Sequence, residues 1–404
     1  MRLYLAAAFS LKRLETYAVY DRKGDELYEL DEEAFRFLEK CSSPEGCGES
    51  SPRHRDFIDY CLAEGILSTH AVTVKRPLPV PAGSPSLRYL ELQITERCTL
   101  RCRHCYLGET EGRELPTDEI EAVLHEFEEM QGLRLLITGG EPLLHHDFDA
   151  VNRLLPAYSF RKVLFTNGML LHDGVLQTLN VDEIQFSIDG MEQGHDALRG
   201  AGSYRALLGR VESALQAGWD VSVATMVHRE NLGEFEEMSF LFRRMGIKDW
   251  TVDVPSPSGR MAENPLLQVP PEKAGRFLAY GFGGGMHGGG EGFACGLHLA
   301  AVLANGAVAK CAFYAHAPSG SIREGLRNGW AGIRPLPLAE LECSKKGCRF
   351  IELCRGGCRF RASAASGGEG EGQSGTGNEK VDRYRCCAYD TYDTMNQREH
   401  EAPG

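Results

Sequence analysis

Three cysteines, Cys98, Cys102 and Cys105, share one short stretch of the chain with the spacing C-x3-C-x2-C. The stretch directly follows a strand-like run, Tyr89 to Ile94. An odd trio in one short loop cannot be a disulfide framework, because one thiol stays unpaired. Four thiolates normally hold an iron–sulfur cluster, so three ligands on a cubane leave one iron open to a substrate or cofactor. A zinc site with a distant fourth ligand, or a chance grouping, is the alternative.

The spacing after a first strand, with His104 in the usually aromatic slot before the third cysteine, resembles the radical S-adenosylmethionine (SAM) family. The resemblance implies that Cys98, Cys102 and Cys105 hold a [4Fe–4S] cluster, whose open iron chelates the amino and carboxylate groups of SAM. It also implies that one electron from the cluster cleaves SAM to a 5′-deoxyadenosyl radical, which abstracts hydrogen from the substrate. An external electron donor of the flavodoxin or ferredoxin type is expected with it.

The composition narrows the class of protein. The 404 residues suffice for two or three domains. A net charge of −13 without a long basic run argues against a nucleic-acid-binding surface. No apolar run reaches the roughly 18 residues of a membrane span, and the apolar start of the chain is too short for a signal peptide. We therefore expect no membrane span and a cytoplasmic location.

The 14 cysteines are clustered, which in a chain without an export signal favours metal over disulfides. A reducing cytoplasm fits this usage. Cys41 and Cys47 flank a Ser/Pro/Gly loop in the first part of the chain, and we expect them to be free thiols.

Residues 1–75 read as a separate small unit of strands followed by helices. Three strand-like runs (Arg2–Ala8, Glu15–Tyr20 and Glu26–Leu30) precede a helical pattern that Asp31 caps and a second one over about 53–65. The order is similar to the winged-helix-like peptide-recognition modules of ribosomal-peptide maturases, the RiPP recognition elements, which bind a leader peptide as an added strand. A merely structural extension is the alternative. The proline-rich residues 76–86 are a stiff linker.

Strands and helices alternate over residues 87–260. The predicted strands are Tyr89–Thr95, Arg134–Thr138, Lys162–Thr166, Glu183–Ile188, Val221–Val227 and Trp250–Val254, and the predicted helices are Thr117–Met130, with Thr117 as cap, Phe148–Leu155, Gly174–Leu179, Ser203–Ala217 and Leu232–Met245. Six such units predict an α/β fold with a parallel sheet. The resemblance selects a partial (β/α)6 TIM-like radical SAM barrel, with its chemistry at the carboxyl ends of the strands.

Those strand ends carry glycines and polar residues. Taken singly they could be turns, but the resemblance implies that they contact SAM. The segment Gly139, Gly140 and Glu141 would bind its amino group, with the glycines allowing a close backbone approach to the ligand. Asn167, Ser187 and Asp189 would lie at its ribose or carboxylate, and Arg199 would pair with the carboxylate.

A glycine-rich connection, residues 261–294, leads to a cysteine-rich tail, residues 295–404. The tail resembles the SPASM extension of radical SAM enzymes. It departs from that pattern in two places: four residues instead of two separate Cys343 from Cys348, and the last cysteine of the pattern is a pair, Cys386 and Cys387. The resemblance implies one or two auxiliary [4Fe–4S] clusters, and a zinc ribbon is the rival. The inner cluster would take Cys295, Cys311 and Cys358, and the outer one Cys343, Cys348, Cys354 and either Cys386 or Cys387. The low-complexity residues 366–377 receive no function.

The resemblance as a whole implies an enzyme that modifies a ribosomally synthesised peptide with a leader sequence, by a cross-link or another oxidative C–H modification. Radical modification of a haem-type tetrapyrrole, or of a protein residue as in sulfatase maturation, is the enzymatic alternative. A non-catalytic electron carrier or cluster scaffold is the alternative of a different class.

Overall fold

The computed structural model describes residues 2–48, 55–72, 79–284, 292–364 and 381–386. Its centre is a nine-stranded sheet in the order β12-β11-β10-β9-β8-β7-β13-β14-β15. Six neighbours in it are parallel: β7 (Tyr89–Thr95), β8 (Arg134–Gly139), β9 (Arg161–Thr166), β10 (Glu183–Ser187), β11 (Asp220–Met226) and β12 (Asp249–Asp253). The sequence prediction of these six strands is confirmed to within one residue at each end. The sheet ends at β12 and β15 and therefore forms a partial barrel.

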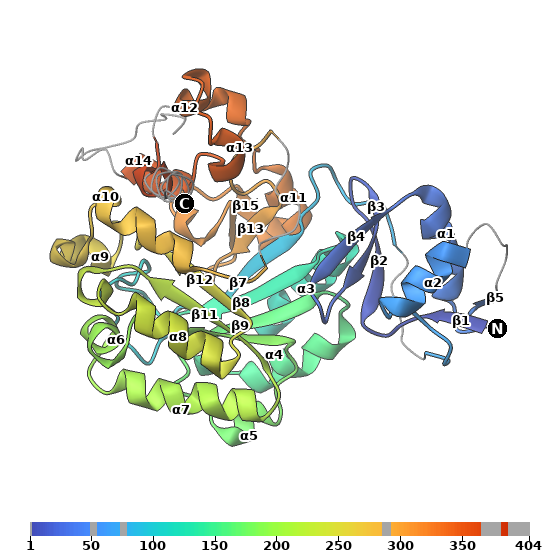
Figure 1. The fold of residues 1–404 in the computed structure, drawn as a ribbon, viewed down its shortest axis with the longest axis horizontal. Helices are drawn as coiled ribbons and strands as arrows, with labels where there is room; N and C mark the ends of the chain where they lie inside the picture. The colour runs from blue at the N-terminus through green and yellow to red at the C-terminus, as the bar shows by residue number, and fades with distance from the viewer. Residues whose placement is uncertain (1, 49–54, 73–78, 285–291, 365–380, 387–404) are drawn as a thin grey trace, which may run out of the picture.

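Helices connect the parallel strands and cover the outer face of the sheet (Figure 1). They are α3 (Thr117–Glu129), α4 (Phe148–Leu154), α5 (Asp173–Leu176), α6 (Glu192–Arg199), α7 (Ser203–Gln216) and α8 (Phe235–Met245). Helix α6 was not predicted. The capping prediction for Thr117 is wrong: Pro116 precedes the helix without a side-chain cap, and the Thr117 hydroxyl instead donates to Asp147 Oδ2 at 3.1 Å.

The main core lies between the sheet and these helices. Leu90, Leu92 and Ile94 of β7 alternate with polar residues and pack in one cluster with Val123 and Phe127 of α3. This alternation is what a strand with two different faces requires. It leaves Glu91, Gln93 and Thr95 on the opposite, inner face.

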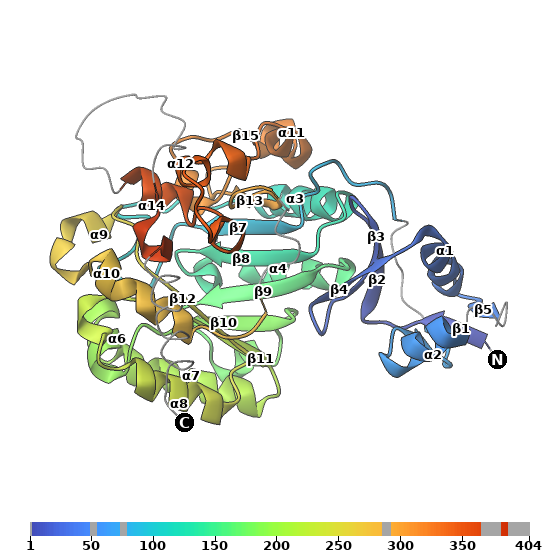
Figure 2. The ribbon, with the colours of Figure 1, turned by 45° about the horizontal axis from the view of Figure 1, so that its top comes forward.

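The chain after β12 adds three strands and several short helices. Strand β13 (Leu299–Val302) pairs parallel with β7, and β14 (Ala307–Ala309) and β15 (Gly320–Ser321) follow antiparallel. The helices are α9 (Arg260–Glu263), α10 (Pro271–Ala274), α11 (Leu326–Ala331), α12 (Glu342–Lys345), α13 (Ile351–Cys354) and α14 (Arg359–Ala364). In both ribbon views α11 lies beside β15, whereas α9 and α10 lie on the side of β12 (Figures 1 and 2), where Arg361 of α14 also reaches Asp253.

The N-terminal residues form two small sheets and two helices at one end of the molecule (Figure 1). The elements are β1 (Arg2–Leu5), β2 (Phe9–Arg13), β3 (Tyr17–Asp21), β4 (Glu26–Leu30), α1 (Glu32–Cys41), β5 (Cys47–Gly48), α2 (Arg55–Ala63) and β6 (Leu67–Ser68). The predicted cap is confirmed, since Asp31 accepts from Ala34 N at 2.7 Å. The first predicted strand is wrong at its end: the chain turns where Phe9 N donates to Ala6 O, and β2 begins there.

The expectation of free thiols at Cys41 and Cys47 is also wrong, because the two form a disulfide. Cys41 ends α1 and Cys47 begins β5, which pairs with β1. Gly46 takes a positive φ of 64°, which lets the chain reverse between them and brings their Cα atoms to 4.6 Å. Sequence spacing alone could not reveal a closure that depends on the pairing of β5 with β1.

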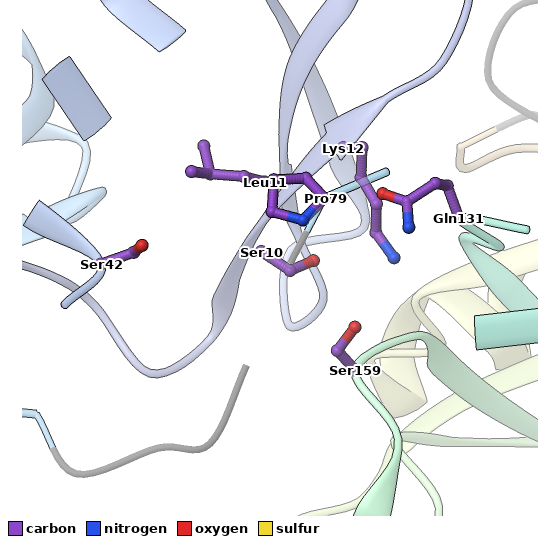
Figure 3. Close-up of a pocket in the computed structure, with 7 residues that line it drawn as sticks. All are labelled: Ser10, Leu11, Lys12, Ser42, Pro79, Gln131 and Ser159. Carbon is purple, nitrogen blue, oxygen red and sulfur yellow. The ribbon is translucent and has the colours of Figure 1, made fainter. Parts of the chain in front are cut away.

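The N-terminal module, residues 2–72, is fastened to the barrel by buried charges. Lys12 Nζ of β2 donates to Gly132 O at 2.8 Å, and Arg161 of β9 donates to the backbone oxygens of Arg22 and Lys23. A small pocket lies at this seam and is lined by Ser10, Leu11, Lys12, Ser42, Pro79, Gln131 and Ser159 (Figure 3). None of the predicted site residues lines it. Among the described residues no helix is both long and apolar enough to cross a membrane.

Candidate functional site

The three cysteines of the first motif lie in the loop after β7, where the sulfurs of Cys98 and Cys102 accept hydrogen bonds. Cys98 Sγ accepts from Leu100 N at 3.5 Å and from Asn167 Nδ2 at 3.6 Å, and Cys102 Sγ accepts from Arg199 Nη1 at 3.8 Å. Hydrogen bonds to sulfur and a nearby cation stabilise a thiolate. The donor set therefore fits metal-bound thiolates of a [4Fe–4S] cluster.

The environment of Cys102 points the same way. Burial raises the pKa of its thiol, and the thiols of Cys98 and Cys105 add to the rise against the opposing charge of Arg199. A metal bound to Cys102 would replace its proton and so offset the cost of the buried thiolate.

The glycines after β8 are required by the cysteine loop itself. A Cβ on Gly140 would lie 2.3 Å from Arg97 O, and one on Gly139 would lie 2.6 Å from Thr95 O. Gly140 N donates to Thr95 O at 2.8 Å, and Glu141 N donates to Arg97 O at 2.7 Å. The close approach thus fixes the loop that carries Cys98, and a contact of these glycines with SAM stays a prediction.

Glu141 is fully buried and joins two strand ends. Its carboxylate accepts from Thr166 Oγ1 and from Asn167 N, both at 2.8 Å. Burial raises the pKa of Glu141 to about 7, while the same hydrogen bonds lower it. The side chain holds the end of β9 beside the end of β8, and this places Asn167 against Cys98.

Asp189 positions Arg199. The fully buried Asp189 carboxylate accepts from Arg199 Nε at 2.5 Å and from Met226 N at 2.7 Å. Burial alone would raise the pKa of Asp189, but the Arg199 guanidinium holds it well below the usual range. Arg199 ends α6 and reaches Cys102, so the structure brings both residues to the cysteine loop. Ser187 ends β10 at the same edge of the sheet.

Three buried residues around Asp189 were missed by sequence reasoning: His195, His228 and Asn231. His228 Nε2 lies 2.9 Å from Asp189 O, and Asn231 Nδ2 donates to the same oxygen at 2.7 Å. His228 and Asn231 follow β11, so a search of every strand end would have found them. His104 lies at the edge of this group, with Nε2 at 3.9 Å from Asp189 Oδ2.

His104 gives a pH-dependent prediction. Burial lowers the pKa of His104 to about 3 from an ordinary 6.5, so between these values the unfolded chain binds the proton and the folded protein does not. The free energy of unfolding therefore rises with pH over this window. His104→Phe should remove up to about 1.4 kcal/mol per pH unit of that slope. Urea unfolding of the cofactor-free protein between pH 4.5 and 6.5 measures it, with the exposed His70→Phe as control; equal slopes in all three proteins would contradict the assignment.

The cysteines of the tail fall into two groups. Burial and the thiols of Cys295 and Cys358 raise the pKa of Cys311, as does the carboxylate of Glu91. Burial and the thiols of Cys354, Cys348 and Cys343 raise the pKa of Cys386 to about 12. The structure thus brings together the two sets expected from the sequence, except for Cys387, which lies outside the described residues.

In the part of the chain that the structure describes, no three Cys, His, Asp or Glu side chains are grouped as ligands of a single metal ion. Thiolates on one zinc ion lie about 2.3 Å from it, whereas a cubane spreads its ligands over four irons. The roles of all these cysteines as ligands stay predictions.

The inner tail set faces the first motif. Tyr106 follows Cys105, and its ring lies 4.9 Å from that of Phe313, two residues after Cys311. Phe313 in turn stacks on Phe360, two residues after Cys358, at 5.4 Å. Segments far apart in the sequence therefore meet between the cysteine trio and the tail.

Comparison with known proteins agrees with this geometry. Residues 92–242 match the model of the radical SAM superfamily. The chain is 29% identical over 205 residues to the AdoMet-dependent heme synthase of Oleidesulfovibrio alaskensis, covering 49% of this chain and 53% of that protein. It is 30% identical over 181 residues to the mycofactocin maturase MftC of Mycobacterium ulcerans, covering 43% of this chain and 49% of that protein. The matched region spans about half the length of these curated relatives.

Among solved structures, Streptococcus suis SuiB bound to S-adenosylmethionine has a TM-score of 0.66 at 14% identity, covering 95% of this chain and 100% of that one. SuiB bound to its precursor peptide SuiA has a TM-score of 0.63 at 15% identity, covering 90% and 97%. At these identities the likeness shows the fold alone.

Proposed function

We propose that the protein is a radical SAM oxidoreductase that matures a ribosomally synthesised peptide, with a [4Fe–4S] cluster and SAM as its cofactors. The proposal is carried by the contact of Tyr106 with Phe313, because it sets the cysteine trio opposite the inner cysteine set of the tail. The curated maturase MftC and the peptide-bound SuiB, both similar to this chain, support a peptide substrate.

Cys98, Cys102 and Cys105 would hold the cluster, with Asn167 donating to the sulfur of Cys98 and Arg199 to that of Cys102. Arg199 is held by Asp189 with its guanidinium at Cys102, where it can also pair with a substrate or cofactor carboxylate. When bound, the cluster and SAM supply hydrogen abstraction from an unactivated C–H bond, which acid–base side chains cannot perform.

The tail would hold one or two auxiliary [4Fe–4S] clusters in a SPASM-like arrangement, residues 295–404. Cys295, Cys311 and Cys358 would serve the inner cluster, and Cys343, Cys348, Cys354 and Cys386 the outer one, with Cys387 as the competing ligand. Removal of a hydrogen atom leaves a substrate that must lose a further electron to form a cross-link or another oxidised product. Nearby clusters give that electron an acceptor, and a flavodoxin- or ferredoxin-type donor would supply the reducing electron. We place the protein in the cytoplasm.

The N-terminal module, taken as residues 1–75, would bind the leader peptide, with residues 76–86 as its linker to the barrel. In the sheet β2-β3-β4 both β2 and β4 are edge strands, but Ala82 N of the linker already donates to Arg13 O of β2. The edge of β4 is therefore the place where an extended peptide can add as a strand.

A proline scan of β4 tests this docking. Adjacent residues of a strand point their N–H groups to opposite edges of that strand. Of the two variants Tyr28→Pro and Glu29→Pro, one therefore removes an N–H that points away from β3, toward the free edge. The other removes an N–H that pairs with β3. The outward variant should weaken leader binding by up to about tenfold, because one backbone hydrogen bond to the leader is lost, without lowering the melting temperature of the protein. Fluorescence anisotropy of a labelled leader peptide measures the affinity. Equal affinity in both variants would place the leader elsewhere.

Co-expression with the small open reading frames encoded beside this protein tests the main proposal. Mass spectrometry should find a peptide that has lost hydrogen atoms only when both genes are present. The similarity to AdoMet-dependent heme synthase favours a tetrapyrrole as the second candidate substrate. A mass loss in an added haem precursor, with every peptide unchanged, would choose that candidate; no SAM cleavage by the reconstituted protein would leave only a cluster scaffold.

A further inference from the structure

A carboxylate that has no assigned role lies on the inner face of the sheet, next to the inner cysteine set of the tail. Glu91 is in the middle of β7, and its neighbours Leu90 and Leu92 face the helices. Among the described residues, one hydrogen bond reaches its carboxylate, from Ala312 N to Oε2 at 2.8 Å. Its remaining oxygen can accept from a ligand. Burial raises the pKa of Glu91 against this hydrogen bond, so an added donor or cation would relieve an unfavourable environment.

Aromatic rings stand beside this carboxylate. Phe313 directly follows Ala312, whose N–H donates to Glu91, and its ring contacts that of Tyr106. Tyr106, Phe313 and Phe360 form a continuous series of ring contacts, at 4.9 and 5.4 Å, and all three are only partly buried. The series begins next to Cys105 and ends two residues after Cys358.

We propose that Glu91, Tyr106, Phe313 and Phe360 form the subsite that holds a substrate side chain, and that this side chain carries an N–H or O–H donor on an aromatic or alkyl body. The inference rests on the proposed function and names the substrate residue that it would take. A carboxylate near a series of aromatic rings can accept a hydrogen bond from such a group and attract a cation, while the rings cover the apolar body of the side chain. A carboxylate-bearing side chain is repelled.

The proposed subsite lies between the two sets of cysteines. A side chain bound between Cys105 and the pair Cys311 and Cys358 lies between the two places at which a hydrogen atom and an electron would be removed. Ala312 links the two parts directly, since its N–H, next to Cys311, holds the carboxylate of Glu91.

Four small probes test the subsite in the anaerobically reconstituted protein: n-butylammonium, p-cresol, toluene and butanoate. Ligand-observed NMR titrations should show saturable binding of n-butylammonium, p-cresol or both, and binding of toluene and butanoate at least about tenfold weaker. Preference for n-butylammonium indicates a lysine-type substrate residue, and preference for p-cresol indicates a tyrosine-type one. If neither donor probe binds, or if toluene or butanoate binds as well, the proposal is wrong.

Glu91→Gln is the informative variant. Its side-chain oxygen can still accept from Ala312 N, which preserves the fold, but its amide then presents a donor to the probe. Affinity for the preferred probe should fall about tenfold. The matched control is Glu121→Gln, an exposed glutamate of α3, which should bind as the wild type does.

Equal affinity of Glu91→Gln and wild type would overturn the subsite. SAM cleavage by the wild type and by Glu121→Gln, measured in the same samples, reports on the radical SAM function separately. Probe binding without any SAM cleavage would therefore refute the proposed function and leave the subsite standing.

Discussion

Simultaneous replacement of Cys98, Cys102 and Cys105 by alanine should reduce SAM cleavage in the presence of dithionite to the rate of a protein-free sample. The three sulfurs with their donors from Asn167 and Arg199 form the site that fits the SAM-binding cluster, and no other described cysteine lies in the β7 loop. The whole catalysed rate is lost, which for enzymes is a factor of about 10⁶ or more. Chromatography of 5′-deoxyadenosine after anaerobic reconstitution measures it.

The control separates this site from the tail. Cys354→Ala should lose the peptide product while SAM cleavage continues, because its thiol belongs with those of Cys348 and Cys343 in the outer set. Cys61→Ala, in the core of the N-terminal module, should change neither reaction. Cleavage of SAM by the triple variant, or iron-free preparations of the wild type, would remove the basis of the assignment.

Arg361→Met should lower the free energy of unfolding by about 3–5 kcal/mol, because it removes one partner of a buried ion pair. The Arg361 guanidinium, 4% exposed, donates to Asp253 Oδ1 at 2.7 Å and to Asp382 Oδ2 at 3.0 Å. Asp253 ends β12 of the barrel, whereas Asp382 lies in the tail, four residues before Cys386. Arg361 therefore connects the tail to the barrel. Asp382 also accepts from Cys358 N at 2.7 Å, and its loss of a partner should disturb that cysteine.

Urea unfolding and iron content of the same preparations test this role. The control is Arg383→Met, whose guanidinium pairs with Glu272 on the surface with 65% and 55% of the two side chains exposed. Exposed ion pairs contribute about 0–1 kcal/mol to the free energy of unfolding. The free energy of unfolding of this variant should therefore be close to that of the wild type, and its iron content should be unchanged. A change of similar size in both variants would mean that the buried pair does not anchor the tail.

Much of the site could be predicted from the sequence because its signals are local. The trio spacing places three thiols in one loop, and alternating β and α periodicity places that loop at a strand end. The division of the tail thiols into two sets, which the family pattern suggested, agrees with their proximity in the structure. Helix α6 was missed because its eight residues contain one glycine and few apolar positions, although Arg199 at its end was singled out.

Other features could not be predicted because they depend on long-range contacts. The disulfide of Cys41 and Cys47 needs β5 beside β1. Asp189 was expected near SAM, yet its carboxylate is taken up by Arg199 and Met226 N. Glu141 likewise accepts hydrogen bonds from Thr166 and Asn167 and so ties strand ends together. Each outcome is decided by a partner far away in the chain.

By itself, then, the sequence determined the order of six β/α units, the loop with its three thiols and the residues at each strand end, since period and spacing are properties of neighbours. Only the tertiary structure decided which of these groups meet. Strand β13 pairs beside β7 across some two hundred intervening residues, and this pairing brings Cys311 and Ala312 to Glu91 and Tyr106. Such closure depends on packing of the whole sheet, which no local pattern encodes.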